Sequence, residues 1–328
     1  MKTSTRAAAV AAVATLAAVL TACSPSSPAG ESTPDAADAT TLDSVTVGIL
    51  AIADLVPIHM GLEAGVFEEH GIDLELEFAQ GGAAIVPAVV SGEYDFGYSN
   101  VVSLLVAHEN SIPIQIVSNG SSSSGVAGAD ATEVAALADS GIEDALDLQG
   151  KRVAINALGN FGEITIRNSI AAAGGDPDAV TFVEIPYPNM PAQLAAGEVD
   201  AAWTTEPFRS QILAEGGAIV ASPMTDMSDS FDSAYFFTST ALAADDADLV
   251  SRFTAAVHES FALAMEDEAA TRAALVDFNE LDEATAKTIA MPTWHPEINR
   301  DGLEALAAAA KTYGVLREDP DYTSFLGE

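Results

Sequence analysis

The sequence predicts an α/β protein with two lobes, each a mostly parallel sheet flanked by helices. With 328 residues, the chain is longer than one hydrophobic core usually serves. Apolar runs of strand length alternate with helical segments, as in parallel sheets that helices cover on both faces. The phrase Gly-Glu-x-Asp also occurs twice, within SGEYDFGYSN (91–100) and AGEVDAAWTTEPF (196–208), which indicates a repeated unit.

The first half of the chain contains four predicted strands. The run VTVGILAI (45–52) is apolar and rich in β-branched residues, and DLELEF (73–78) alternates acidic and apolar residues like a strand with one wet face. A helix between them is expected to end near Gly71, and a short helix after them is expected to end at Gly92. The strands YDFGYS and IPIQIVSN follow.

The second half repeats this order. Its predicted strands are 151–157, 180–185, 199–204, 218–222 and 234–240. A short helix before the third of these ends at Gly197, as the earlier one ends at Gly92. The separation from Val47 to Gly92 is 45 residues and that from Ala154 to Gly197 is 43, so both units place the same turn at the same point. From Asp246 onward the pattern is mainly helical.

The N-terminal residues predict export and lipid attachment. Lys2 and Arg6 precede an apolar stretch, 7–20, which has the length of a signal-peptide core and is too short to span a bilayer. The sequence LTAC follows and resembles a bacterial lipoprotein signal, in which Cys23 becomes the lipid-modified N-terminus. Cys23 is the only cysteine of the chain, so a reactive thiol or an intermolecular disulfide is the alternative.

The residues after this cysteine are rich in Ser, Pro, Ala and Thr without apolar periodicity, which is typical of a flexible tether. The predicted boundaries are a signal peptide at 1–22, a tether at 23–43, lobe 1 at 44–122 and 235–328, lobe 2 at 126–222, and crossings near 118–126 and 222–234.

The charge of the chain excludes several partners. The formal net charge is −37, and without residues 1–22 it is about −39, because two basic and no acidic residues are lost. Such a surface repels nucleic acid and anionic lipid headgroups, so the lipid anchor is the only expected membrane contact. Between Arg6 and Lys151 there is no Lys or Arg, so the first half of the mature chain has no arginine to clamp an anion.

The sequence carries no signature of catalysis, metal or cofactor. Its five histidines lack the spacing of paired metal ligands. It has no Gly-x-Ser-x-Gly nucleophile turn and no Gly-x-x-x-x-Gly-Lys phosphate loop, so any ATPase that it serves must be another chain. We therefore expect a binding protein rather than an enzyme.

A resemblance to a known family rests on five phrases that occur in family order: GVFEEHGIDLELEF, VVSGEYDFGYSN, DLQGKRVAIN, LAAGEVDAAWTTEPF and MPTWHPEIN. They are similar to the nitrate, aliphatic-sulfonate, taurine and thiamine-pyrimidine-precursor group of solute-binding proteins of ABC importers. The resemblance implies a two-lobe type II periplasmic-binding-protein fold that traps a small solute between its lobes. It also implies a monomer with a permease and a separate ATPase subunit as partners. Together with the lipoprotein signal, it predicts an exported protein that is lipid-anchored on the outer face of the cytoplasmic membrane.

The candidate solute-binding residues follow the predicted strands, because ligands of such sheets collect beyond the carboxyl ends of the strands. They are Asp54, Leu55, Gly82, Ala83, Tyr98, Ser99 and Asn100 in the first unit, and Asn160, Phe161, Gly162, Tyr187, Trp203, Thr204, Thr205 and Glu206 in the second. We expect them on two facing sets of loops that form a cleft.

Several candidates have a structural alternative. Trp203 can cover the core of the second lobe, and Asp54 can cap the next helix. Glu206, in the turn Glu-Pro-Phe, can accept backbone N–H groups at a helix start. The helix start at Gly162 can bind an anion, but Glu163 in the same turn can occupy that field.

Two kinds of solute and three functions remain open. A sulfonate-, nitrate- or taurine-type anion would need backbone N–H groups, hydroxyls and Arg167 or Arg209. A planar aromatic or pyrimidine-type compound would stack on the aromatic rings, with Asp54 or Glu206 accepting from its amine. The predicted function is capture and delivery of such a solute. The alternatives are an enzyme of the same fold, related to thiamine-pyrimidine synthesis, and a sensor co-receptor.

Overall fold

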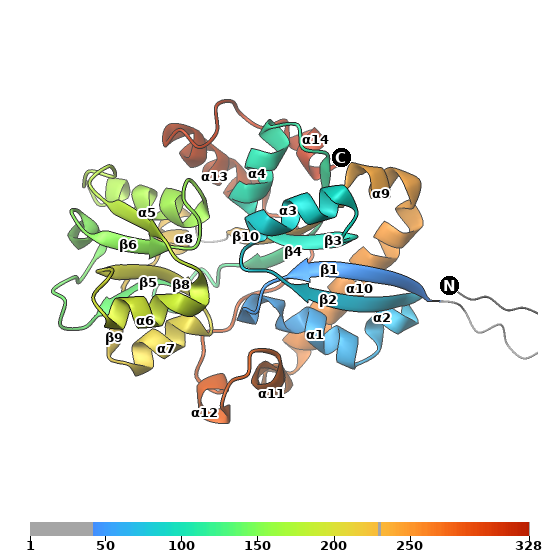
Figure 1. The fold of residues 1–328 in the computed structure, drawn as a ribbon, viewed down its shortest axis with the longest axis horizontal. Helices are drawn as coiled ribbons and strands as arrows, with labels where there is room; N and C mark the ends of the chain where they lie inside the picture. The colour runs from blue at the N-terminus through green and yellow to red at the C-terminus, as the bar shows by residue number, and fades with distance from the viewer. Residues whose placement is uncertain (1–41, 229–230, 328) are drawn as a thin grey trace, which may run out of the picture. The chain divides into compact units, whose positions relative to one another are not determined.

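The computed structural model describes residues 42–228 and 231–327. The predicted signal peptide, Cys23 and nearly all of the tether lie outside the described residues. The described chain forms two five-stranded sheets, here called sheet A and sheet B (Figure 1). The strand order is β2-β1-β3-β10-β4 in sheet A and β7-β6-β8-β5-β9 in sheet B. This confirms the predicted fold of two mostly parallel α/β lobes.

The two sheets have equivalent topologies. Sheet A consists of β1 (Asp43–Ile49), β2 (Ile72–Phe78), β3 (Phe96–Asn100), β4 (Ile114–Ser122) and β10 (Asp232–Ser239). Sheet B consists of β5 (Thr132–Leu137), β6 (Arg152–Ile155), β7 (Thr181–Glu184), β8 (Ala201–Thr205) and β9 (Gly217–Ala221). In each sheet, the strand that follows a passage from the other sheet is antiparallel to its neighbours; these strands are β10 and β5.

Helices cover both faces of each sheet (Figure 1). The segments around sheet A are η1 (Ala53–Leu55), α1 (Val56–Glu63), α2 (Val66–Glu69), α3 (Gly82–Ser91), α4 (Val101–Glu109), α9 (Thr240–Asp245), α10 (Ala247–Glu266), α11 (Glu268–Phe278), α12 (Glu283–Ala286), α13 (Arg300–Thr312) and α14 (Tyr322–Leu326). Those around sheet B are η2 (Ala145–Leu148), α5 (Phe161–Ala172), η3 (Tyr187–Asn189), α6 (Met190–Ala195), α7 (Phe208–Ala214) and α8 (Pro223–Met227). Within the described part of the chain, no helix combines the length and hydropathy that crossing a bilayer requires.

The repeated phrase marks the same turn in both sheets. Gly92 and Gly197 adopt φ angles of 76° and 71°, which favour glycine and end the short helices α3 and α6. Four residues after each glycine comes the first residue of a strand that pairs with the first strand of its unit. Val47 of β1 pairs with the strand that starts at Phe96, and Val153 of β6 pairs with the strand that starts at Ala201.

The aspartate of the phrase ties these two strands together. The Asp95 carboxylate accepts a hydrogen bond from the backbone N–H of Thr46 at 2.9 Å, and the Asp95 N–H donates to the Thr46 carbonyl at 2.9 Å. Asp200 and Arg152 form the same two bonds, at 2.7 and 2.8 Å. The backbone donor of Arg152 is also the main reason why the pKa of Asp200 lies below its usual range. The phrase recurs because each repeated unit fastens its third strand to its first in this way.

Some predicted elements are wrong in extent. The helix expected to end near Gly71 is two helices, α1 and α2, because Gly65 between them adopts a φ of 78°. Strand β4 continues to Ser122, so most of the polar run expected in the first crossing belongs to sheet A. Its buried serine hydroxyls are hydrogen-bonded, which allows a polar strand in the interior. Strand β5 was not predicted, because its alanine-rich run, Thr-Glu-Val-Ala-Ala-Leu, lacks the period of a half-buried strand.

Candidate functional site

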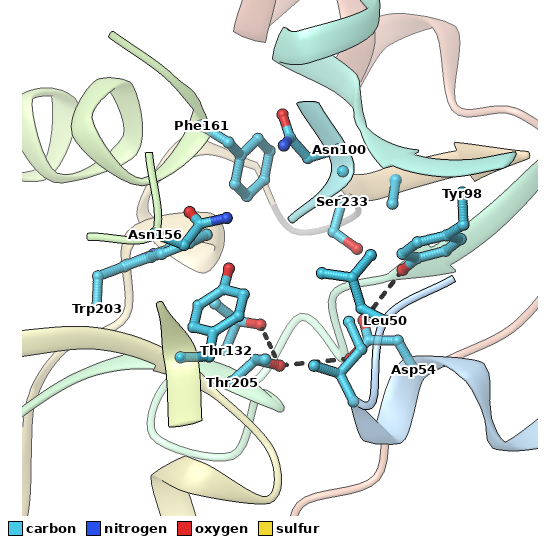
Figure 2. Close-up of a pocket in the computed structure, with 14 residues that line it drawn as sticks. Leu50, Asp54, Tyr98, Asn100, Thr132, Asn156, Phe161, Trp203, Thr205 and Ser233 are labelled. Atoms are coloured by element: carbon cyan, nitrogen blue, oxygen red, sulfur yellow. Dashed lines mark hydrogen bonds between the residues drawn. The ribbon is translucent and has the colours of Figure 1, made fainter. Parts of the chain in front are cut away.

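A small cavity of about 40 Å³ lies where strand ends of both sheets converge (Figure 2). Segments of sheet A contribute Leu50, Ile52, Asp54, Gly82, Tyr98, Asn100, Ser233 and Ala234 to its wall. Segments of sheet B contribute Thr132, Asn156, Phe161, Tyr187, Trp203 and Thr205. Most of these residues lie at or just beyond the carboxyl ends of parallel strands, which is where open α/β sheets bind their ligands. The cavity is therefore the candidate solute site.

Asp54 is the centre of the polar wall. Its carboxylate accepts a hydrogen bond from Ser121 Oγ at 2.7 Å. It also accepts from Thr205 Oγ1 at 3.4 Å and from the Tyr98 hydroxyl at 3.5 Å (Figure 2). The side chain is only 6% exposed, and this burial raises its pKa against the effect of the hydroxyl donors. The Asp54 carbonyl in turn accepts from Trp294 Nε1 at 2.7 Å. Asp54 is thus held by residues from both sheets and from the C-terminal segment.

The aromatic wall comes mainly from sheet B. The Trp203 ring is 3% exposed and lies 5.6 Å from the Phe161 ring and 6.0 Å from the Tyr187 ring, measured between centroids. Gly162 packs so closely that a Cβ at this position would lie 2.7 Å from Trp203 Cε3. Trp203 Nε1 is buried without a hydrogen-bond partner. A donor that is buried at a cavity wall without a partner is available to a solute.

Hydrogen bonds between described segments of the two sheets surround the cavity. One is the bond from Thr205 to Asp54 described above, and another runs from the Ala53 N–H to the Glu206 carbonyl at 3.0 Å. A third runs from Asn160 Nδ2 to Ser103 Oγ at 2.8 Å. These contacts hold the strand ends of the two sheets against each other.

The structure brings eight of the fifteen candidate residues to the cavity. These are Asp54, Gly82, Tyr98, Asn100, Phe161, Tyr187, Trp203 and Thr205. Seven do not line it: Leu55, Ala83, Ser99, Asn160, Gly162, Thr204 and Glu206. Leu55 belongs to the core, and Ser99 and Thr204 are buried with hydroxyls that have no hydrogen-bond partner. Ala83 lines a separate apolar groove between α3 and α4.

Two of these seven have structural contacts: those of Glu206 match the alternative given for it, and those of Asn160 cap a helix. The Glu206 carboxylate accepts from Arg209 Nη1 at 3.1 Å, from Ser210 Oγ at 2.8 Å and from the Ala290 N–H at 2.9 Å. It is therefore fully engaged at the start of α7 and with the C-terminal segment. Asn160 caps α5 by accepting from the Phe161 N–H at 2.7 Å, while its amide forms the bond to the other sheet.

Sequence reasoning missed Leu50, Ile52, Thr132, Asn156, Ser233 and Ala234. Asn156 follows strand β6 directly, but the predicted strand, 151–157, ran past it, so the strand-end rule did not select it. Thr132 opens the unpredicted strand β5, where its hydroxyl donates to Thr205 at 2.8 Å. Ser233 lies at the start of strand β10, just after the second passage between the sheets, with its hydroxyl 2.6 Å from that of Ser121. Local sequence gave no sign that these serines meet.

The arginines considered for an anion are engaged elsewhere. Arg167 pairs with Glu163 at 2.9 Å and with Asp178 at 2.6 Å, and its guanidinium lies over the Phe182 ring. Glu163 also accepts from the N–H of Gly159, so a carboxylate already occupies the start of α5. Arg209 pairs with Glu206 and with the Gly128 carbonyl. Among the described residues, no group of three or more His, Cys, Asp or Glu side chains could hold a metal ion.

The chain matches a known family over most of its length. Residues 52–270 match the model of the NMT1/THI5-like family. A protein of Brachyspira hyodysenteriae (strain ATCC 49526 / WA1), named as an ABC transporter periplasmic binding protein, is 25% identical over 210 residues, which cover 60% of this chain and 57% of that one. The chain spans about half the length of the curated relatives that it matches.

Solved structures share the fold at low sequence identity. The aliphatic sulphonate binding protein SsuA of Escherichia coli superposes with a TM-score of 0.70 at 15% identity, over 86% of this chain and 91% of that one. The nitrate-binding protein NrtA of Synechocystis PCC 6803 superposes with a TM-score of 0.74 at 13% identity, over 87% and 85%. At this identity the likeness supports the two-lobe periplasmic-binding-protein fold.

Proposed function

The chain belongs to the NMT1/THI5-like family, and from this premise we propose that it is the solute receptor of an ABC importer. It captures a small organic solute in the cavity between its two sheets and delivers it to a permease that a separate ATPase subunit drives. The relative named as an ABC transporter periplasmic binding protein supports this assignment. The observation that carries it is the wall of the cavity, to which the strand ends of both sheets contribute.

Opening and closing would take place at the two passages between the sheets. The first lies between Ser122 of β4 and Thr132 of β5, and the second lies between Ala221 of β9 and Asp232 of β10. Since the strands of each sheet pair only among themselves and only two passages of the chain join the sheets, a hinge motion can expose the cavity without breaking either sheet. The bonds from Thr205 to Asp54 and from Asn160 to Ser103 would then form on closure.

Cys23 would carry the lipid anchor after removal of residues 1–22. The acidic surface gives no other means of binding an anionic membrane, and several acyl chains on one residue make attachment stable where a single chain is marginal. The receptor would then stand on the outer face of the cytoplasmic membrane as a monomer.

Native mass spectrometry of protein purified without refolding tests this function. We expect a small molecule to remain bound to the wild type and to be lost from Trp203→Ala, with an affinity loss of about 1–3 kcal/mol, as for a buried aromatic anchor. Met265→Ala, at a position 56% exposed and away from the cavity, is the control and should retain the molecule. Equal retention by Trp203→Ala would place the solute elsewhere, and a wild type that never binds one would contradict the function.

A further inference from the structure

In the part of the chain that the structure describes, the cavity wall contains one carboxyl side chain and no cationic side chain that could balance its charge. Of the described residues that line it, Asp54 is the only Asp or Glu, and none is Lys, Arg or His. The donors that reach its carboxylate are all neutral: the hydroxyls of Ser121, Thr205 and Tyr98, and its own backbone N–H. A buried carboxylate is normally paired with a positive charge, because burial removes its hydration. The structure supplies no such partner from the protein side.

Aromatic rings surround this carboxylate. Tyr187 lies near enough for the charge of Asp54 to raise the pKa of its phenol further, beyond the larger effect of burial. Phe161 and Trp203 complete the wall opposite Asp54, and the amide of Asn156 lies beside them (Figure 2). Ring faces attract cations and stack on planar groups, so they complement a carboxylate in binding a flat cation.

An anion would meet the opposite conditions. It would lie next to Asp54, and the two arginines that could have clamped it, Arg167 and Arg209, are held in ion pairs outside the cavity. The start of α5 already receives the carboxylate of Glu163. The start of α3, where Gly82 lines the cavity, and the unpartnered Trp203 Nε1 are donors that remain for an anion, and neither carries a full positive charge. Charge balance therefore favours a cation.

We propose, on the basis of the receptor function above, that the solute carries a protonated nitrogen base on a planar ring and donates its N–H groups to the Asp54 carboxylate. The ring lies against the aromatic wall formed by Phe161, Tyr187 and Trp203. Asp54 selects a solute with a positive charge, and the aromatic wall selects a planar one. Binding neutralises a carboxylate that is otherwise buried without a counter-ion.

Three probes of one shape and different charge test this inference. Benzamidine is a planar cation, benzamide is its neutral analogue, and benzoate is its anionic analogue. Both tryptophans of the chain report on the site, because Trp203 lines the cavity and Trp294 bonds to the Asp54 carbonyl. Titration followed by tryptophan fluorescence and by calorimetry should show benzamidine binding at least tenfold more tightly than benzoate or benzamide.

Two further measurements assign this preference to Asp54. Asp54→Asn should bind benzamidine at least tenfold more weakly than the wild type does. The control Asp139→Asn makes the same change in charge at an exposed position and should bind benzamidine as tightly as the wild type. In the wild type, the affinity for benzamidine should rise with pH as Asp54 ionises. The titratable groups that face Asp54 are Tyr98 and Tyr187. Burial raises the pKa values of both phenols, so they stay neutral while Asp54 ionises.

The outcomes separate this inference from the receptor function. Tighter binding of benzoate, nitrate or methanesulfonate, unaffected by Asp54→Asn, would overturn the cationic solute and leave the receptor function standing. Affinity for benzamidine that is independent of pH would also overturn it, and this result does not depend on whether Asp54→Asn folds. If no probe of any charge binds, the inference is wrong, and mass spectrometry of the wild type decides the receptor function separately.

Discussion

Glu133 makes the stability of the protein depend on pH near neutrality. It lies in strand β5 with no exposed surface, and burial raises its pKa from 4.5 to about 7. The charge of Asp130 acts in the same direction, while a hydrogen bond from Ser222 and the charge of Arg209 act against it. Ser222 and Asp130 lie in the two passages between the sheets, so this carboxyl titrates at the connection of the lobes.

The sign and size of the effect follow from this pKa. Because the folded value lies above the unfolded one, the contribution of Glu133 to the free energy of unfolding is fully present below pH 4.5 and is lost as the pH rises through about 7. One pKa unit corresponds to about 1.4 kcal/mol, so the total loss is about 3 kcal/mol. A neutral residue of the same shape, as in Glu133→Gln, avoids this loss.

Chemical denaturation followed by tryptophan fluorescence measures this loss of free energy of unfolding. As the pH rises from 5 to 8, the wild type should lose about 2–3 kcal/mol of its free energy of unfolding relative to Glu133→Gln. Asp139→Asn, which removes an exposed carboxyl two residues beyond the end of β5, serves as the control. Its free energy of unfolding should change with pH in parallel with that of the wild type. Parallel curves for Glu133→Gln would show that Glu133 is ionised in the folded protein throughout this range and would refute the reasoning.

Four further substitutions test the packing of the lobes and the lipid anchor. Gly162→Ala places a Cβ against the Trp203 ring, so it should cost about 1–3 kcal/mol in thermal unfolding and shift tryptophan emission; an unchanged spectrum would mean that the ring has room to move. Asp95→Ala and Asp200→Ala each remove a bond to a backbone N–H of the first strand, and each should cost about 1–2 kcal/mol; an effect in only one lobe would argue against equivalent roles. Cys23→Ala should release the protein from membranes on cell fractionation, and continued membrane association would exclude attachment at this cysteine.

The fold was predictable because its signals are local and repeated. Apolar runs, the glycines that end α3 and α6, and the spacing between them are all visible along one stretch of chain. The meeting of Ser121 with Ser233 and Asp54 was not, because it joins residues from three segments that are distant in sequence. Likewise, the lack of any cation near Asp54 is a property of the folded cavity, since Arg167 and Arg209 stood as candidates until their partners were known.

One signal for the site was present in the sequence and remained unused. The repeat aligns Tyr98, Ser99 and Asn100 at the end of β3 with Trp203, Thr204 and Thr205 at the end of β8. Successive side chains of a strand point to opposite faces, so the first and third of each triplet share one face and the middle one takes the other. In the structure, the first and third of each triplet line the cavity, and the middle hydroxyls are buried away from it.

This alternation explains why the repeated phrase can stay constant while the site differs between the lobes. Gly-Glu-x-Asp fixes where each strand starts, and the strand period then aims its third and fifth residues at the cavity. Different residues at these positions change the cavity wall without moving the strands. One lobe presents a phenol and an amide, and the other presents an indole and a hydroxyl. Two copies of one unit can therefore build an asymmetric cavity, in which one side holds the buried carboxylate and the other holds most of the rings.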